Sequence, residues 1–574
     1  MSISRPTPIS RPKRLARLAA CTALALSAGT LGASPALAAD KPSAPAGAAK
    51  SRPAMPWLGS AKSTYATTPA KSRMDYDRDG LPDLVWRHVS GTSQSFMTSS
   101  TSDTSERFTI DGDDVETVKD VIPVGNVRGT AAPEVLTLSF DGRLSLHPAG
   151  KSGAGAAIWS GYGWQIYNRV IAAGDLTKDG RMDVLARTPG GSLYLYKGNG
   201  ATSGNPFGTR IHVGTGWGSY DQIIGTNDLD RDGIGDLLAR TTAGDLWFYK
   251  GTGSSSTPFK ARVKVGPGWG AYNQIVATDD LSGDGRADIM ARTYAGSVYV
   301  YLSTGSGRFS TRHFWQSGWE DTEFFLGSGI TANYGRHSLL ARGTDGKIYQ
   351  YLTKANGSFY EKDDTGFQIP TAKMTGAAGL DKVNWVSPVE ITVGGLYVHR
   401  GNVSQLAAGI PGNAVNITGP GDLTGDGRGD LLNVTSTGYL DLYAGDGTGK
   451  AYKTAVRVGS GWGTYNKLVG GGDFTGDGRP DLIARTSGGT LYLYPGTGNA
   501  SAPFGSRVTV GTGWNTYNQI ASPGDLTGDG RADLVARDSG GNLYRYMATG
   551  KTGTSTFGAR VLLGSGWNTF EGLY

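Results

Sequence analysis

Three aspartates within nine residues recur along this sequence, and such a group could hold a metal ion or act as an acid and a base. In the stretch "DLTGDGRAD" the acids are Asp525, Asp529 and Asp533, and a glycine follows the second of them. The stretch has seven intact copies, which start at Asp75, Asp175, Asp228, Asp280, Asp422, Asp473 and Asp525. An active site is normally unique, so a motif present seven times favours a structural role over catalysis.

The shared pattern D-x-[DST]-x-D-G-x-x-D suits Ca²⁺. It places side-chain oxygens at positions 1, 3, 5 and 9, with a backbone carbonyl available at position 7. Ca²⁺ takes about six to eight such oxygens, and a glycine at position 6 permits the sharp turn of an EF-hand loop. No cysteine or histidine enters the pattern, which argues against Zn²⁺. The predicted side-chain ligands are Asp75, Asp77, Asp79, Asp83, Asp175, Thr177, Asp179, Asp183, Asp228, Asp230, Asp232, Asp236, Asp280, Ser282, Asp284, Asp288, Asp422, Thr424, Asp426, Asp430, Asp473, Thr475, Asp477, Asp481, Asp525, Thr527, Asp529 and Asp533.

The alternative is an acidic turn that folds without metal. Three carboxylates crowded into nine residues repel one another unless a cation neutralises them, which favours metal. We therefore predict up to seven structural Ca²⁺ sites that couple ion binding to folding. Degenerate copies near residues 126, 330 and 379 lack the acids, and we expect no metal there.

The elements around each loop predict a β-propeller blade. A short apolar strand such as Asp481–Arg485 follows the loop, then a Gly-Gly turn, then Leu491–Tyr494. A Gly/Ser/Pro loop leads to Ser506–Trp514, and Tyr517–Ile520 runs into the next acidic loop. Four short strands per unit, turn residues between them and the absence of helical periodicity are typical of all-β propellers. The content of 90 Gly and 25 Pro agrees with a turn-rich fold.

The number of units indicates two rings. Ten units are present at intervals of 43 to 53 residues, whereas a propeller usually has about four to eight blades. The loop at Asp175 returns at Asp422, 247 residues later, and that at Asp280 returns at Asp525, 245 residues later. We predict tandem propellers, two five-bladed rings of four-stranded blades, at residues 74–327 and 328–574. The alternatives are one seven-bladed ring with extra blades, or one large ring.

The N-terminus has the composition of a secretory signal peptide. Five basic residues precede the apolar stretch 18–32, and "ALAAD" supplies a small-residue cleavage site near Ala39. Residues 1–39 are the predicted signal peptide and 40–73 a Pro/Ala/Ser-rich linker. The only cysteine, Cys21, lies near the start of this stretch, with the basic residues before it and most of the apolar run after it, which disfavours lipid attachment. The mature chain would be secreted, without a membrane-spanning run.

The charge of the repeat region excludes one class of partner. Residues 74–574 hold 44 Lys/Arg against 48 Asp/Glu, a formal charge of −4. A nucleic-acid-binding protein needs a basic face, so we do not expect nucleic acid as a partner.

Repeated aromatic residues are the best candidates for ligand binding. An aromatic face stacks on the C–H face of a sugar, and a neighbouring amide or carboxylate binds its hydroxyls. The alternative is that each tryptophan packs one blade on the next. The candidates are Trp164, Tyr167, Trp217, Tyr220, Trp269, Tyr272, Trp319, Trp462, Tyr465, Trp514, Tyr517 and Trp567.

Two family resemblances rest on these motifs. The acidic loop followed by "DLLAR"-type strands resembles the FG-GAP/VCBS repeats of integrin-like β-propellers, over most of residues 75–574. The "VGTGW…Y" segments resemble blades of tachylectin-like five-bladed propeller lectins. The first resemblance implies the fold and Ca²⁺, and the second implies sugar pockets between neighbouring blades.

We find no sequence sign of catalysis. The chain has no G-x-S-x-G and no H-E-x-x-H, and its histidines are not in register with the repeat: His88, His147, His212, His313, His337 and His399. The prediction is therefore a secreted, calcium-stabilised lectin-like protein without catalytic activity, whose partners are glycans or cell-surface polysaccharide. The alternative is a protein-interaction or targeting subunit of a larger secreted complex, and a secreted hydrolase is less favoured.

Overall fold

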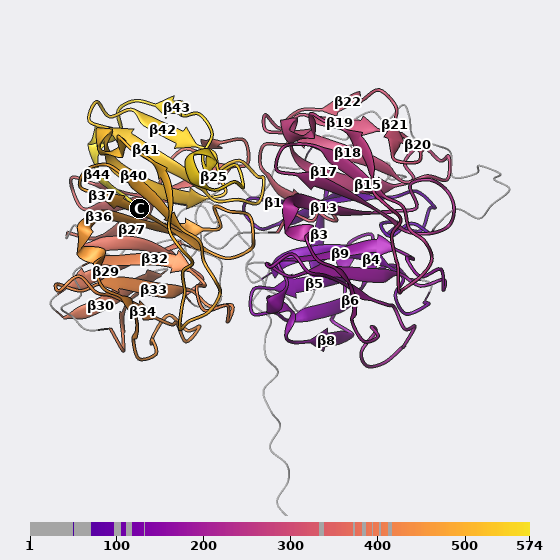
Figure 1. Cartoon of the computed structure of the whole chain (residues 1–574), viewed down its shortest axis with the longest axis horizontal. Helices are drawn as coiled ribbons and strands as arrows, with labels where there is room; N and C mark the ends of the chain where they lie inside the picture. Colours follow the sequence, from indigo (N-terminus) through magenta and orange to yellow (C-terminus); the bar gives the residue numbers. More distant parts are fainter. Residues whose placement is uncertain are drawn as a thin grey trace, which may run out of the picture. The chain divides into compact units, whose positions relative to one another are not determined.

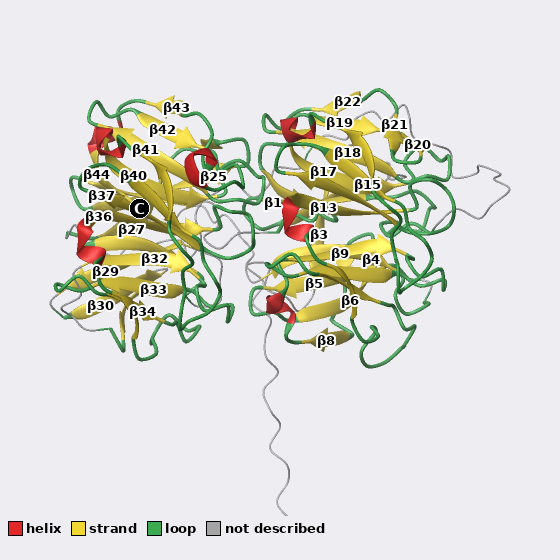
Figure 2. Ribbon diagram, in the orientation of Figure 1, coloured by secondary structure: helices red, strands yellow, loops and turns green. Residues whose placement is uncertain are grey.

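The computed structural model describes residue 50 and residues 71–96, 105–110, 118–130, 132–331, 338–370, 373–380, 386–392, 394–400, 403–410 and 416–574. This part of the chain is built almost entirely of antiparallel β-sheets (Figure 1, Figure 2). Its helical segments are three-residue 3-10 turns: η1 (Trp164–Ile166), η2 (Trp217–Ser219), η3 (Trp269–Ala271), η4 (Trp462–Thr464), η5 (Trp514–Thr516), η6 (Gly553–Ser555) and η7 (Trp567–Thr569). The prediction of an all-β tandem propeller is confirmed.

The N-terminal half forms five blade-like sheets. In order from the inner strand, they are β23 (Thr322–Phe325), β1 (Leu84–His88), β2 (Ser93–Phe96), β3 (Glu106–Ile110); β4 (Val118–Gly125), β5 (Glu134–Ser139), β6 (Leu144–Gly150), β8 (Trp159–Gly161); β9 (Arg169–Gly174), β10 (Asp183–Arg187), β11 (Leu193–Tyr196), β12 (Ile211–Gly214); β13 (Tyr220–Asn227), β14 (Asp236–Thr241), β15 (Leu246–Tyr249), β16 (Val263–Gly266); and β17 (Tyr272–Asp279), β18 (Asp288–Thr293), β19 (Val298–Tyr301), β22 (His313–Gln316). The short strand β7 (Gly153–Ala154) joins β3 to β6, and β20 (Ser303–Gly305) pairs with β21 (Arg308–Phe309).

The C-terminal half repeats this arrangement. Its sheets are β44 (Phe570–Leu573), β24 (Ser338–Gly343), β25 (Lys347–Lys354), β27 (Asp363–Gln368); β28 (Met374–Ala378), β29 (Val386–Thr392), β30 (Gly395–Arg400), β31 (Val403–Ala407); β32 (Asn416–Gly421), β33 (Asp430–Val434), β34 (Leu440–Tyr443), β35 (Val456–Gly459); β36 (Tyr465–Gly472), β37 (Asp481–Thr486), β38 (Leu491–Tyr494), β39 (Val508–Gly511); and β40 (Tyr517–Gly524), β41 (Asp533–Asp538), β42 (Leu543–Tyr546), β43 (Val561–Gly564). The short β26 (Ser358–Phe359) pairs antiparallel with the end of β25.

A sequence unit and a structural blade are offset by one strand. The segment that ends each unit, such as Tyr517–Ile520, lies in the inner strand of the next sheet rather than at the outer edge of its own. The acidic loop therefore connects the first two strands of a blade, and the prediction that one unit equals one blade is wrong by one strand.

The offset also explains how each half closes. The last inner strand of the first half, β23, pairs with β1, and Trp86 lies opposite Phe325. At the C-terminus β44 pairs with β24, and Ala341 lies opposite Leu573. In both halves the end of the repeat array supplies the inner strand of the first sheet, which gives that sheet its four blade strands. We call the two halves the first ring and the second ring.

The hydrophobic core lies between neighbouring sheets. In one cluster Ile171 of β9 and Leu185 of β10 pack with Ile223 of β13 and Leu237 of β14, and all four are buried. Strands such as Leu193–Tyr196 alternate buried and half-buried residues, as expected for a sheet with one better-covered face. Burial of apolar surface at each seam thus holds the blades side by side.

A residue assigned by sequence to the linker fills the middle of the first ring. Arg73 is 1% exposed, and its guanidinium donates hydrogen bonds to the carbonyl oxygens of Ala172 in β9 and Gly225 in β13, at 2.5 and 3.0 Å. The same side chain pairs with Asp279 at the end of β17. Lys50 also contacts this ring, since its ammonium lies 2.7 Å from a carboxylate oxygen of Asp321. The described residues of the 40–73 segment therefore belong to the folded body.

Candidate functional site

The acidic loops share one backbone conformation, which loop 175–183 illustrates. Asp175 accepts hydrogen bonds from the backbone N–H of Asp179 at 3.2 Å and of Gly180 at 2.7 Å. Asp179 in turn accepts the N–H of Arg181 at 3.1 Å. Gly180 has a φ of 82°, in the left-handed region that glycine adopts without steric cost. Equivalent bonds recur in the other six loops, so the aspartates shape the turn as well as offering oxygens.

The ninth residue of each loop accepts backbone hydrogen bonds that hold the loop in place, a role that the sequence did not reveal. Asp183 is buried, and one of its oxygens accepts the N–H groups of Leu176 and Thr177, both at 3.0 Å. Its other oxygen accepts the N–H of Gly198, fifteen residues along the chain, at 3.0 Å. The bond to the residue fifteen positions later recurs at Asp236, Asp288, Asp430, Asp481 and Asp533. This carboxylate ties the loop to the start of the outer hairpin connection.

The loops bring oxygens together in a way that fits a cation. Among the described residues, two groups place three carboxylate oxygens within 4.8 Å of one another: Asp75, Asp77 and Asp83, and Asp228, Asp230 and Asp236. Both groups use positions 1, 3 and 9 of the loop, and the other five loops carry a Thr or Ser hydroxyl in place of the carboxylate at position 3.

Three of the predicted ligand oxygens are buried without a hydrogen-bond partner. They belong to the hydroxyl of Thr177 and to the carboxylates of Asp79 and Asp230. Burial, reinforced by the charges of Asp175 and Asp179, also raises the pKa of Asp183 to about 7. Unsatisfied oxygens beside crowded carboxylates favour a bound cation, which would supply the missing partner and the missing charge.

Basic side chains neutralise part of this charge. The Lys250 ammonium pairs with Asp230 and lies 2.7 Å from Asp232. In other loops Lys197 lies 3.4 Å from Asp179, and Arg286 lies 2.7 Å from Asp284. These pairs are partly exposed, so each contributes only about 0 to 1 kcal/mol.

The degenerate loop at residue 126 replaces the acids with an internal ion pair. Arg128 stands at position 3 and Glu134 at position 9, and their side chains lie 2.5 Å apart. Glu134 still accepts the N–H of Val127 at 2.9 Å, as a ninth-position aspartate would. This loop therefore keeps the backbone hydrogen bond of the ninth position. The positive charge beside its carboxylate is the Arg128 guanidinium.

The repeated tryptophans lie at the seams between blades. Each follows a glycine with positive φ and begins a 3-10 turn that leads into an inner strand. Trp164, which is 8% exposed, has its ring centroid 4.7 Å from that of Tyr196 and 6.3 Å from that of Phe207. The counterparts Trp217, Trp269, Trp462 and Trp514 are equally buried, and Trp567 is half-buried against Tyr351. Packing is therefore one role of these residues.

A pair of tyrosine hydroxyls and an exposed arginine complete each seam. The hydroxyl oxygens of Tyr167 and Tyr196 lie 2.6 Å apart, and Arg210 donates to Tyr167 at 3.2 Å. The Arg210 guanidinium also lies over the half-exposed ring of Tyr194, 4.8 Å from its centroid. We call Trp164, Tyr167, Tyr194, Tyr196, Phe207 and Arg210, with their counterparts, the seam cluster. The counterparts are Trp217, Tyr220, Trp247, Tyr249, Phe259, Arg262; Trp269, Tyr272, Tyr299, Tyr301, Phe309, Arg312; Trp462, Tyr465, Tyr492, Tyr494, Phe504, Arg507; and Trp514, Tyr517, Tyr544, Tyr546, Phe557, Arg560.

The asparagines after these tyrosines are engaged in blade-to-blade bonds. Arg187 of β10 donates to the side-chain oxygen of Asn168 at 3.1 Å and to the carbonyl oxygens of Trp217 and Tyr220 at 3.1 and 2.7 Å. The arginine of the "DLLAR" strand thus joins one blade to the turn of the next. The same arrangement recurs at Arg240, Arg292, Arg485 and Arg537. Sequence reasoning missed this residue, although its fixed place in the repeat was a signal.

Trp319 is in a different environment from the other candidates. It is 0% exposed and packs against Trp86 at 4.9 Å and Trp315 at 5.7 Å between ring centroids. The Lys50 ammonium lies 4.9 Å from its ring. These neighbours cover the ring, so its role in this structure is packing.

Two of the histidines are held by structural hydrogen bonds. His147 is buried, and its ring nitrogens lie 3.0 Å from the Thr137 hydroxyl and 2.8 Å from the Gly155 carbonyl oxygen. His88 accepts the backbone N–H of Ser90 at 3.0 Å within the β1–β2 turn. These contacts hold turns and neighbouring strands in place.

Four segments of the chain match a known repeat family. The FG-GAP-like repeat family matches residues 175–239, 228–291, 422–484 and 473–536. The chain carries FG-GAP-like repeats. Each matched FG-GAP-like segment spans two successive acidic loops with the strands between them, and the matches fall in corresponding parts of the two rings.

Other comparisons give distant likenesses. No curated protein matches this chain. The crystal structure of the lectin BP39L from Burkholderia pseudomallei is 14% identical, covers 70% of this chain and 99% of its own, and has a TM-score of 0.26. The crystal structure of BBS1N in complex with ARL6DN is 11% identical, covers 66% of this chain and 93% of its own, and has a TM-score of 0.22. Within the described residues, no helix is long and apolar enough to span a bilayer.

Proposed function

We propose that this protein is a secreted, calcium-stabilised propeller that binds carbohydrate at the seams between its blades and catalyses no reaction. The observation that supports carbohydrate binding is the recurrence of the seam cluster in register at five seams. Secretion is inferred from residues 1–39, which lie outside the described residues.

The exposed part of a seam cluster has the chemistry of a shallow sugar site. Half-exposed rings such as Tyr194 and Tyr196 offer apolar faces, while their hydroxyls and Arg210 offer hydrogen bonds to sugar hydroxyls. The buried tryptophan supports these rings from below. Several weak sites on one rigid body would raise the apparent affinity for a repeating glycan.

The test is a glycan array probed with the mature protein. Replacement of the exposed arginines of three first-ring clusters, Arg210→Ala, Arg262→Ala and Arg312→Ala together, should reduce the signal about tenfold or more. Exposed Arg107 lies outside the clusters, so Arg107→Ala is the matched control. Unchanged binding in the triple variant, or no bound glycan at all, would reject carbohydrate binding at the seams.

Calcium binding is the second part of the proposal. It is supported by the unpartnered oxygens of Thr177, Asp79 and Asp230 and by the raised pKa of loop aspartates. Bound Ca²⁺ would supply positive charge between the carboxylates and link ion binding to blade stability.

Chelation tests calcium binding directly. Addition of EDTA should lower the Tm of the mature protein, and Asp175→Asn should lower the number of Ca²⁺ ions bound per chain in equilibrium dialysis. Asp538 lies outside the acidic loops on a hairpin turn, so Asp538→Asn should leave that number unchanged. An EDTA-insensitive Tm would contradict the calcium proposal.

A protein-interaction role is the alternative, and one surface feature favours it. Tyr162 is 74% exposed, with Ile158 and Ile166 also exposed on the same stretch of the first ring. Exposed apolar residues grouped in this way often mark a protein contact. A stoichiometric partner that co-purifies with the wild-type protein but not with Tyr162→Ser, without glycan binding, would favour this role.

A further inference from the structure

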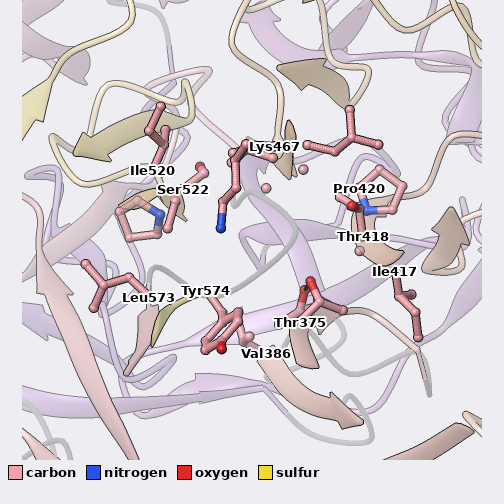
Figure 3. Close-up of a pocket in the computed structure, with 18 of the residues that line it drawn as sticks. Thr375, Val386, Ile417, Thr418, Pro420, Lys467, Ile520, Ser522, Leu573 and Tyr574 are labelled. Atoms are coloured by element: carbon pink, nitrogen blue, oxygen red, sulfur yellow. Dashed lines mark hydrogen bonds between the residues drawn. The ribbon is translucent and has the colours of Figure 1, made fainter. Parts of the chain in front are cut away.

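The second ring encloses a cavity of about 330 Å³ at its centre. Its walls are the inner strands β28, β32, β36, β40 and β44. Lys467 of β36 projects into this space, and Thr418, Ser522 and Tyr574 line it (Figure 3). Its size falls in the range of about 300 to 1,000 Å³ that holds small ligands.

Glycines form part of the cavity lining, and the inner strands approach one another closely at these positions. A Cβ at Gly419 would lie 2.6 Å from the carbonyl oxygen of Gly376, and one at Gly470 would lie 2.5 Å from that of Gly419. Inner strands are paired on one side only, so their other edges offer N–H and C=O groups toward the centre. Such groups require hydrogen-bond partners.

The first ring supplies those partners from its own side chains. Arg73 donates to the carbonyl oxygens of Ala172 and Gly225, as described above. Gln222 donates to those of Ile275 and Ser328, at 2.7 and 2.6 Å.

The second ring has far fewer such bonds. Among the described residues, Gln519 donates to the carbonyl oxygen of Glu571 at 3.1 Å, and Thr375 donates to that of its neighbour Gly376 at 3.2 Å. Side chains of the protein thus occupy the centre of the first ring, whereas the centre of the second ring is a cavity.

Lys467 places an uncompensated positive charge in the open cavity. Within the described part of the chain, its ammonium has no hydrogen bond or ion pair. Glu571 also lines the cavity, and its carboxylate is paired with Arg342. Tyr574 faces Lys467 with its ring centroid 6.0 Å away, and Arg485 lies opposite Lys467 on β37. A guest that satisfies this cavity must therefore bring negative charge for Lys467.

We propose that the centre of the second ring binds a small hydroxylated carboxylic acid of the sugar-acid class. The carboxylate would pair with Lys467, and the hydroxyl groups would bond to the backbone groups of the inner strands and to Thr418 and Ser522. This site is separate from the seam clusters, so it does not depend on the proposed glycan binding.

The test is isothermal titration of the full mature chain with sodium glucuronate at pH 7. Glucose, which has similar shape and no charge, should bind about tenfold or more weakly, since a charge-assisted hydrogen bond is lost. Inorganic sulfate should also bind about tenfold more weakly, because it lacks the pattern of hydroxyl groups.

Variants locate the site. Lys467→Met keeps the length of the side chain and should weaken glucuronate binding about tenfold or more, whereas Lys467→Arg should retain most of it. The matched control is Lys347→Met, because Lys347 is exposed on β25 of the same ring and does not line the cavity.

Four results would overturn the proposal: no glucuronate binding at millimolar concentration, equal binding of glucose, equal binding of sulfate, or undiminished binding by Lys467→Met. The comparison of glucuronate, glucose and sulfate uses the wild-type protein, so it tests the proposal even where a variant fails to fold. Array binding that is absent, or unchanged in the seam triple variant, with glucuronate binding intact would reject the lectin proposal alone.

Discussion

Arg73 and Asp279 form a buried ion pair that links a position two residues before the first acidic loop to the end of the inner strand β17. The Asp279 carboxylate accepts hydrogen bonds from Nε of Arg73 at 3.0 Å and from a terminal guanidinium nitrogen at 2.7 Å. Both side chains are 2% exposed. Together with its hydrogen bonds to β9 and β13, this ion pair means that Arg73 links three inner strands of the first ring.

Replacement of Arg73 should strongly destabilise the first ring. Arg73→Met leaves the Asp279 charge buried without its partner and frees two carbonyl oxygens, so we expect a loss of about 3 to 5 kcal/mol in the free energy of unfolding. Urea unfolding followed by tryptophan fluorescence measures the change. Lys71, two residues earlier, has an exposed side chain, so Lys71→Met is the control and should change stability by less than about 0.5 kcal/mol. Equal stability of the two variants would contradict the role of Arg73.

The ninth-position aspartates should matter with or without metal. Asp183→Ala leaves the N–H groups of Leu176, Thr177 and Gly198 without their acceptor, and each buried unsatisfied donor costs about 1 to 3 kcal/mol. The loss of stability should therefore persist in EDTA. Asp179→Ala is the comparison, because Asp179 is exposed, and its effect on Tm should largely disappear in EDTA. An Asp183→Ala effect that vanished in EDTA would show that this residue acts only through metal.

The buried arginine of the second blade strand should contribute more to stability than the exposed arginine of the seam cluster. Arg187→Met removes bonds to Asn168, Trp217 and Tyr220 across a seam, at a cost of about 1.5 to 3 kcal/mol for each charged hydrogen bond. Arg210→Met removes an exposed contact, and we expect a loss below about 1 kcal/mol. Guanidinium chloride denaturation of the two variants gives both values, and the reverse order would refute the assignment of Arg187 as the seam bond.

Lys467 should make the stability of the second ring depend on pH in the alkaline range. Burial, followed by the nearby charge of Arg485, lowers the pKa of Lys467 from 10.5 to about 8. The unfolded chain therefore holds this proton more tightly, and stability should rise as pH increases from about 8 to about 10.5. Burial raises the pKa of facing Tyr574, which keeps its hydroxyl protonated, and Glu571 stays paired with Arg342.

Comparison with Lys467→Met isolates this contribution from other titrating groups. Relative to the variant, the wild-type protein should gain Tm between pH 7 and pH 9.5 in ligand-free buffer. Parallel Tm curves for the two proteins would show that the Lys467 proton is not linked to folding.

The sequence revealed the repeat, the strand content of each unit and the acidic loops, because these are local. Gly180 and its equivalents are needed for a positive φ, and the aspartates around them bond to backbone a few residues away. Alternating strands such as Leu193–Tyr196 carry their burial pattern in their own residues. The 245-residue spacing of Asp280 and Asp525 likewise reflects a duplication that is visible without coordinates.

Only the tertiary structure decided which segments become neighbours across the rings. Strand β23 completes the blade that begins at Leu84, and Arg73 bonds to Asp279 more than two hundred residues away, although nothing local in either segment specifies the partner. The same limit applies to function. Lys467 occupies an ordinary strand position in the sequence, and it faces an open cavity because the inner strands of the second ring carry glycines where they approach one another and lack a counterpart of Arg73 among the described residues. Long-range closure and the filling of the centre depend on packing between distant segments, which is why the repeat pattern alone could not predict them.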